Sequence, residues 1–196
     1  MPANLQPGYH AHDGFYLRMV LGPGYTSLTS SSNGSDVSVK GGGFALSVAL
    51  GGAVAPNLLL FGEVAFDVIP SPDVKSGGRT TTLDDFSGGL IGFGPGLAYC
   101  LMPVNVCFSG AILVSQFSID AQSNGSGNRI SIFQTRAGPG VDLVVNKEWW
   151  LSPNWGMGIG AHFGAATMKQ KDNVLGTDSP RWTALSAALL GTATFN

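Results

Sequence analysis

Charged residues are scarce in this chain, and no uninterrupted apolar stretch is long. Only 11% of the 196 residues are Asp, Glu, Lys or Arg, less than half of the roughly 25% usual in soluble domains. No apolar run approaches the ~20 residues that a transmembrane helix needs. There is also no basic run, and the formal net charge is −2. The sequence therefore argues against a helical membrane protein and against binding to nucleic acid.

Motifs for metals, cofactors and nucleotides are missing as well. The sequence has no metal-ligand cluster, phosphate loop or nucleotide fingerprint, and its many glycines lie in alternating segments instead of loops that enter helices. His10 and His12 could share a metal ion, but two histidines without further ligands make no closed site. We therefore expect no cofactor and no metal.

A strict alternation of large apolar residues with small ones is present instead. It is clearest over residues 136–164, which contain a turn at 152–154. This period of two is the β-strand period. Tryptophans gather near the turn, where a transmembrane strand would cross the membrane interface. The large residues on one face of this hairpin are Val141, Leu143, Val145, Trp155, Met157, Ile159 and Phe163.

A lipid-facing chain without a spanning helix must be a closed barrel, because every backbone polar group has to be paired internally. The mean hydropathy of +0.21 and the 29 glycines agree with strands that are apolar on one face only. A chain of this length forms one barrel, which we assign to residues 14–196. Residues 1–13 read as a periplasmic lead-in without a signal sequence, so we expect a signal to have been removed.

Eight strand candidates follow one another along the chain. They cover residues 14–25, 37–54, 58–69, 86–100 and 106–119, the two arms of the 136–164 hairpin, and 182–195. Polar loops at 26–36, 70–85, 120–129 and 169–181 alternate with short turns at 55–57, 102–105 and 152–154. Short periplasmic turns and longer outer loops are typical of bacterial outer-membrane barrels. An eight-stranded, antiparallel, up-and-down transmembrane barrel with both termini in the periplasm is predicted.

Three Gly-Pro-Gly triplets fall inside proposed strands, at residues 22–24, 94–96 and 138–140. Proline cannot donate to a strand ladder. We interpret the triplets as bulges or kinks that help the sheet to curve and close.

The polar and ionisable residues within the strands mostly share the inward face. A charge turned to lipid would cost about 2–4 kcal/mol at the membrane midplane. Two arginines against three acids could pair and fill the narrow interior of an eight-stranded barrel. The alternative is a narrow polar path through that filling. The predicted lumen network consists of Arg18, Glu63, Asp67, Gln134, Arg136, Asp142 and His162.

Two further sets of side chains are predicted from position. Cys100 and Cys107 bracket the turn at 102–105 symmetrically, so they form either a disulfide adding about 2 kcal/mol or two free small apolar residues. Aromatic residues near the strand ends are expected to form an interfacial girdle. This girdle comprises Tyr99, Trp149, Trp150, Trp155, Trp182 and Phe195.

An enzymatic role has few candidate residues. Asp142 would lie diagonal to His162 across the hairpin and could orient its imidazole. No motif places an inward serine, such as Ser109, Ser115 or Ser186, beside that histidine. A catalytic serine needs this hydrogen bond, so we predict that the protein is not an enzyme.

Several phrases of the sequence resemble those of small Gram-negative outer-membrane β-barrel proteins of the OmpA-like transmembrane type. They are GFYLRMVLGPGY, VAPNLLLFGE, LAYCLMPVNVCFSG, NKEWWLSPNWGMGIGAHF and ALLGTATFN, and they span nearly the whole chain. The resemblance implies a barrel in the outer membrane, in contact with lipid and lipopolysaccharide. The aromatic residue Phe195 on the closing strand resembles the signal read by the outer-membrane insertion machinery. The resemblance supplies no catalytic residues.

Three functions remain open at this point. The favoured one is a structural anchor or surface-loop binding protein with a plugged lumen, whose external partner the sequence does not name. A narrow small-solute pore is the second. A soluble ligand-binding barrel of the lipocalin kind is the third, although its apolar faces should point inward.

Overall fold

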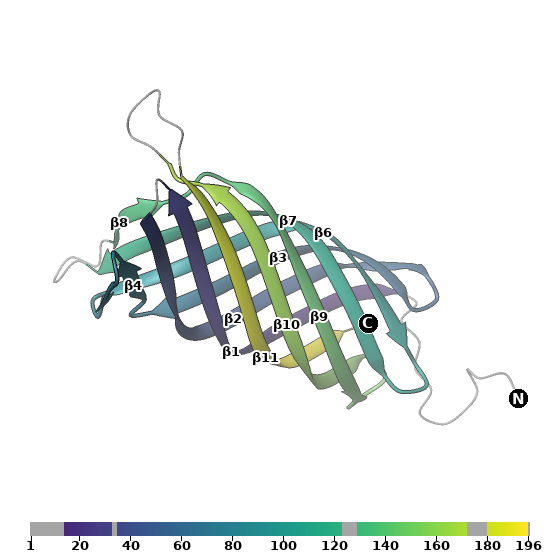
Figure 1. Ribbon diagram of the computed structural model, residues 1–196. Coiled ribbons are helices and arrows are strands. Elements are labelled where there is room, and N and C mark those ends of the chain that lie inside the picture. Colours follow the sequence, from purple (N-terminus) through teal and green to yellow (C-terminus); the bar gives the residue numbers. More distant parts are fainter. Residues whose placement is uncertain (1–13, 33–34, 123–128, 172–179, 196) are drawn as a thin grey trace, which may run out of the picture.

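The computed structural model describes residues 14–32, 35–122, 129–171 and 180–195, and the elements in these ranges are β-strands (Figure 1). The segment 1–13, with His10 and His12, lies outside the described residues. No helix in the described ranges is long and apolar enough to cross a membrane. The strands are β1 (Phe15–Ser32), β2 (Ser35–Ala55), β3 (Leu58–Pro70), β4 (Asp73–Ser76), β5 (Arg79–Thr82), β6 (Phe86–Leu101), β7 (Val106–Gln122), β8 (Arg129–Gln134), β9 (Gly138–Trp150), β10 (Trp155–Lys169) and β11 (Arg181–Phe195).

Eight of these strands close into one antiparallel barrel. The order around the wall is β1, β2, β3, β6, β7, β9, β10 and β11, and β11 pairs back with β1. Arg18 of β1, for example, lies opposite Ala49 on one side and Thr194 on the other. The wall therefore has no open edge, as a lipid environment requires. The predicted eight-stranded up-and-down barrel is confirmed.

The outward side chains form an apolar belt around this wall. On β1, Phe15, Met19, Leu21 and Tyr25 are exposed, whereas Arg18 between them is buried. The ten residue steps from Phe15 to Tyr25 span about 33 Å along the strand. With the usual tilt of ~40°, this gives a belt about 25 Å high, the height of the apolar band on transmembrane barrels.

The two barrel ends differ (Figure 1). Both termini of the barrel and the short turns lie at one end, which we call the terminal end. The opposite end, which we call the loop end, carries β4 and β8. Here the strands continue past the belt, because β1 and β2 remain paired up to Ser32 and Ser35. The predicted loop 26–36 is therefore mostly strand.

Two other predicted segments also differ at the loop end. The segment 70–85 contains the hairpin β4–β5, which pairs with β2. The sixth predicted strand, which began at residue 136, corresponds to β9, and a further strand, β8, precedes it; residues 135–137 lie between the two, and only β9 continues down the wall. A register shift between Ile119 and Asp120 accompanies this interruption. The alternation of residues in the sequence could not show where the pairing of β7 with β8 ends and its pairing with β9 begins.

The pattern of apolar and polar faces inverts above the belt. On β1, Tyr25 is exposed and apolar, but three residues later Leu28 points inward and is fully buried. Inward apolar side chains at this level pack together, with polar residues outside, as in a water-soluble barrel. We call this set the outer apolar cluster; it contains Leu28, Val39, Ile69, Phe117, Ile119, Ala166, Met168, Trp182 and Ala184.

A second apolar set fills the terminal end of the lumen. Its aromatic residues, Tyr16 and Phe61, lie with their ring centroids 6.0 Å apart. We call this set the inner apolar cluster; it contains Tyr16, Ala49, Leu59, Phe61, Ala98, Cys100, Met102, Cys107, Ala111 and Leu113. The expectation that inward residues are small or charged therefore holds only for the middle of the barrel.

The Gly-Pro-Gly triplets are not bulges. At Gly94 and Pro95 the β6–β7 ladder lacks its pairs, yet the register is the same on both sides of the gap. The same one-sided interruption occurs at Gly22 and Pro23 between β1 and β11. A Cβ on Gly94 would overlap the carbonyl oxygen of Ile112 on β7. The glycine is needed because the two strand backbones approach closely beside the proline.

Candidate functional site: the barrel interior

Arg18 is the centre of a polar group that lies between the two apolar clusters. Its Nη2 donates to Glu63 Oε1 at 3.2 Å, and its Nη1 donates to the hydroxyl of Ser109. Ser47 Oγ donates to the same Glu63 oxygen at 2.6 Å. The guanidinium carbon also lies 5.5 Å from the centroid of the Phe61 ring. The charge of this fully buried arginine is thus compensated by a carboxylate and by the face of an aromatic ring.

A second polar group lies nearer the terminal end and was not predicted. Glu148 Oε1 accepts hydrogen bonds from Asn146 Nδ2 at 2.7 Å and from Thr194 Oγ1 at 2.6 Å, and all three residues are buried. Asn146 and Glu148 continue the inward parity of Asp142 along β9. That parity was a usable signal, but the sequence interpretation considered only the neighbouring tryptophans, as residues of the membrane interface.

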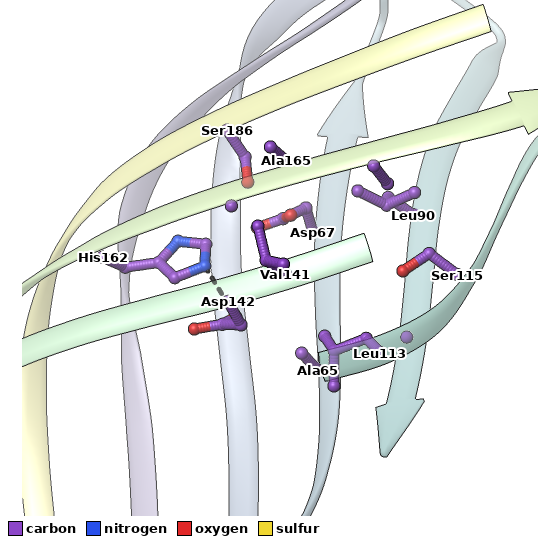
Figure 2. A pocket seen from close by; sticks show the side chains of 13 residues that line it. Ala65, Asp67, Leu90, Leu113, Ser115, Val141, Asp142, His162, Ala165 and Ser186 are labelled. Atoms are coloured by element: carbon purple, nitrogen blue, oxygen red, sulfur yellow. Dashed lines mark hydrogen bonds and ion pairs between the residues drawn. The ribbon is translucent and has the colours of Figure 1, made fainter. Parts of the chain in front are cut away.

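A third polar group joins β9 and β10 nearer the loop end (Figure 2). His162 Nε2 lies 2.8 Å from Asp142 Oδ2, and both side chains are buried. Asp67 of β3 and Ser186 of β11 reach the same small cavity (Figure 2). Its volume is about 20 Å³, enough for about one water molecule. A neighbouring cavity of about 10 Å³ shares Asp67, Asp142 and His162.

The interior carries an excess of acidic residues. Arg18 is the single arginine in the polar groups of the described interior, and it faces four carboxylates, namely Glu63, Asp67, Asp142 and Glu148. One positive and four negative charges give a formal sum of −3 with His162 neutral. The near balance expected from the sequence is therefore wrong, because Glu148 lies inside and Arg136 does not.

Arg136 and Gln134 lie at the loop end, apart from the lumen network. Arg136 is exposed between β8 and β9, where its backbone N–H donates to the carbonyl of Lys169 at 2.7 Å. Gln134 Oε1 accepts from Lys171 Nζ at 3.1 Å at the surface. The parity that assigned both residues to the lumen fails because the strand is interrupted at residues 135–137.

The aromatic residues divide between the surface and the interior. Trp155 and Phe195 pack edge to face at the terminal end with centroids 5.1 Å apart, and Tyr99 and Trp149 are exposed at the same end. Trp150 is half-buried and packs against the inner apolar cluster. Trp182 is 5% exposed and belongs to the outer apolar cluster. Its assignment to the girdle is wrong, because the faces invert above the belt.

Cys100 and Cys107 lie directly opposite each other on β6 and β7 and form a disulfide, with their Cα atoms 4.0 Å apart. Both are buried in the inner apolar cluster. The disulfide therefore closes the hairpin at the turn 102–105, with its sulfur atoms among the apolar side chains of the lumen.

The geometry around His162 offers little for hydrolysis. Ser186 lines the same cavity, but among the described residues no hydrogen bond joins its hydroxyl to His162, whose Nδ1 has no partner. Serine activation requires a hydrogen bond between nucleophile and base. The described residues also include no group of three or more His, Cys, Asp or Glu side chains that could hold a metal ion.

The fold is shared with solved outer-membrane barrels. OprG from Pseudomonas aeruginosa superposes with a TM-score of 0.52 at 10% identity, over 94% of this chain and 98% of that one. Neisserial surface protein A matches with a TM-score of 0.47 at 14% identity, over 92% of this chain and 96% of that one. The outer-membrane protease OmpT from Escherichia coli matches with a TM-score of 0.44 at 9% identity, over 94% of this chain and 97% of that one. No protein-family model and no curated protein matches the sequence. At these identities the similarity shows a common barrel fold.

Proposed function

We propose that this protein is a bacterial outer-membrane barrel with a closed lumen, that it is not an enzyme, and that it acts through its loop end as an anchor or binding surface. Its apolar belt is the support for the membrane placement, because exposed side chains such as Phe44, Phe93 and Ile159 would be costly in water. With the termini in the periplasm, the extended strands of the loop end face the outside.

The single observation that carries the closed lumen is its filling at three levels, the first of which is the inner apolar cluster at the terminal end. At one level Arg18, Glu63 and Ser109 bridge the barrel from β1, β3 and β7. Above it, Phe117 and Trp182 of the outer apolar cluster occupy the lumen from opposite parts of the wall. The cavities left between these levels hold about one water molecule each. A solute would have to displace all three layers to pass.

Two alternatives rest on particular observations. The acidic interior around Asp67 and Asp142 favours a narrow cation path, if the outer apolar cluster moves aside. The inward apolar cluster at the loop end is what a soluble lipocalin-like barrel would have. The lipid-facing belt below it opposes that alternative, because a soluble barrel has no comparable ring of exposed apolar residues.

Single-channel conductance in a planar bilayer tests the closed lumen. The variants are Arg18→Ala with Glu63→Ala for the polar layer, Phe117→Ala with Trp182→Ala for the outer apolar cluster, Tyr16→Ala with Phe61→Ala for the inner apolar cluster, and all six changes together. We expect silence from the wild type and from each pair, because two layers remain, and openings from the sixfold variant. The control carries Leu21→Ala and Leu185→Ala on the lipid face and should stay silent.

Steady conductance of the wild type would contradict the closed lumen and would support the alternative of a narrow pore. Silence of the sixfold variant, in protein that still runs as a folded barrel on an unheated gel, would mean that these three layers are not what closes the lumen. Dependence on detergent separates the membrane barrel from the soluble alternative, which would remain monodisperse in buffer alone.

A further inference from the structure

Basic side chains gather on one arc of the loop end. Lys169 at the end of β10 lies directly opposite Arg181 at the start of β11. Arg136 lies beside Lys169 through the hydrogen bond from its backbone N–H to the Lys169 carbonyl, and Lys171 follows on the same side of β10. All four residues are exposed. Among the described residues, no ion pair joins them to a carboxylate.

The pair of Lys169 and Arg181 is unfavourable on its own. Directly opposite residues on antiparallel strands have Cβ atoms about 4.5–5.5 Å apart, and like charges at such positions destabilise the sheet. Arg136 adds a third cation to the same place. An anion between these side chains would reverse the sign of the interaction, with several charge-assisted hydrogen bonds to its oxygen atoms.

The arc lies just above the layer of lipid headgroups. Leu185 is the last outward apolar residue on β11, and Arg181 is four residues further toward the loop end. Four residues at about 3.3 Å each and a tilt of ~40° place Arg181 about 10 Å above the belt. The headgroup layer begins at the belt edge and is roughly 5–8 Å deep. Long basic side chains reach down into that layer.

The rest of the rim at this height has a different character. On β1, β2, β6 and β7 its outward residues are mainly hydroxyl side chains with one cation and one acid: Ser27, Thr29, Ser38, Lys40, Ser87, Ser118 and Asp120. The hairpin β4–β5 beside β2 adds two exposed cations, Lys75 and Arg79. The arc differs from the β4–β5 hairpin because two of its cations, Lys169 and Arg181, lie directly opposite each other, whereas Lys75 and Arg79 lie opposite hydroxyl residues. A general attraction to an anionic surface would not require this pairing.

We infer that Arg136, Lys169, Lys171 and Arg181 form a binding site for the phosphate groups of an outer-leaflet lipid, a phosphorylated glycolipid such as lipid A. The acyl chains of this lipid lie along the belt below Leu185, and its phosphates meet the arc from the membrane side. The inference rests on the proposed outer-membrane placement. It gives the loop end a defined lipid partner.

The test uses the full-length protein in a zwitterionic detergent, with native mass spectrometry to count bound lipid. The probe is bisphosphorylated lipid A, compared with dephosphorylated lipid A and with inorganic phosphate as competitor. The variant is Lys169→Ser with Arg181→Ser, since serine is common elsewhere on this rim. The matched control is Lys75→Ser with Arg79→Ser, which removes two exposed cations from β4 and β5.

We expect one tightly retained lipid A on the wild type and on the control. The site variant should bind it at least about tenfold more weakly, because two of the four cations that meet the phosphates are removed. Dephosphorylated lipid A should not be retained. Equal retention by the site variant, or an equal loss in the control, overturns the site. If inorganic phosphate at equal concentration displaces lipid A, the site binds free phosphate and the proposal of a lipid ligand is wrong.

The result does not depend on the lumen. A conducting wild type would end the closed-barrel proposal and leave the lipid measurement unchanged. Loss of lipid A from the site variant alone, in a silent barrel, supports both.

Discussion

The guanidinium of Arg18 lies 3.2 Å from Glu63 Oε1, although the two residues are 45 positions apart in the chain. They meet because β1 and β3 both flank β2 and turn inward at the same height: Arg18 and Glu63 each lie opposite Ala49. The small side chain between them leaves room for the pair. The register of β1 and β3 against β2 therefore brings the two charged side chains together.

The pair should be strongly coupled. Arg18→Met or Glu63→Leu alone leaves a buried charge without its partner and should lower the free energy of unfolding by about 3–5 kcal/mol. The double variant should cost much less than the sum of the two. Urea unfolding in lipid vesicles, followed by tryptophan fluorescence, measures the cycle. Lys75→Met on the exposed β4 serves as the control, expected within about 0.5 kcal/mol. Additive costs would contradict a coupled pair.

Gly94 should tolerate no side chain. In Gly94→Ala the new Cβ meets the carbonyl oxygen of Ile112, so β6 and β7 must separate, and we expect a loss of more than about 2 kcal/mol. Gly62 on β3, opposite Pro95, has nothing within 4 Å of the Cβ position. Gly62→Ala should be neutral or slightly stabilising. The same unfolding assay compares them, and equal effects would remove the close-approach explanation.

Brominated lipids should quench the fluorescence of the tryptophans to different extents. Trp149 and Trp155 are about half exposed on the belt side, whereas Trp182 is buried inside the barrel. In variants that keep one tryptophan and replace the others with phenylalanine, bromine should quench Trp149 and Trp155 strongly and Trp182 weakly. Strong quenching of Trp182 would place that side chain in the lipid and would refute the inversion of faces above the belt.

The disulfide should add modest stability. Replacing both Cys100 and Cys107 by alanine releases a constraint on a short loop and should lower the free energy of unfolding by about 2 kcal/mol. Reduction of the wild-type protein should give a similar decrease. Alkylation before and after reduction verifies that the thiols are oxidised at the start. A stability unchanged by reduction would mean that the bond adds nothing beyond the packing of two small residues in the inner apolar cluster.

The membrane-spanning part of the fold was readable from the sequence. The alternation on β1, for example, assigned Phe15, Met19 and Leu21 to the outside and Arg18 to the inside, as observed. Lipid on one side and a confined lumen on the other impose opposite requirements on successive residues. A period of two therefore records the environment of each face, without any knowledge of neighbouring strands.

Tertiary structure decided the assignments near the loop end. Arg136 and Trp182 were both misassigned, because parity has meaning only within a continuous strand and at a known height. Above the belt, water replaces lipid outside the wall, so apolar residues turn inward, and a polar stretch such as 26–32 remains a strand because β2 pairs with it. Local sequence does not state where the membrane ends.

Binary patterning and loop lengths are local properties, and from them the sequence predicts a closed, lipid-facing barrel of eight strands. Which interior groups meet is a property of the tertiary structure. Register placed Arg18 against Glu63 and Glu148 against Thr194, and it set Lys169 opposite Arg181 on the outer rim. These contacts depend on how far each strand slides along its neighbour, and that displacement is fixed by the closing of the whole wall.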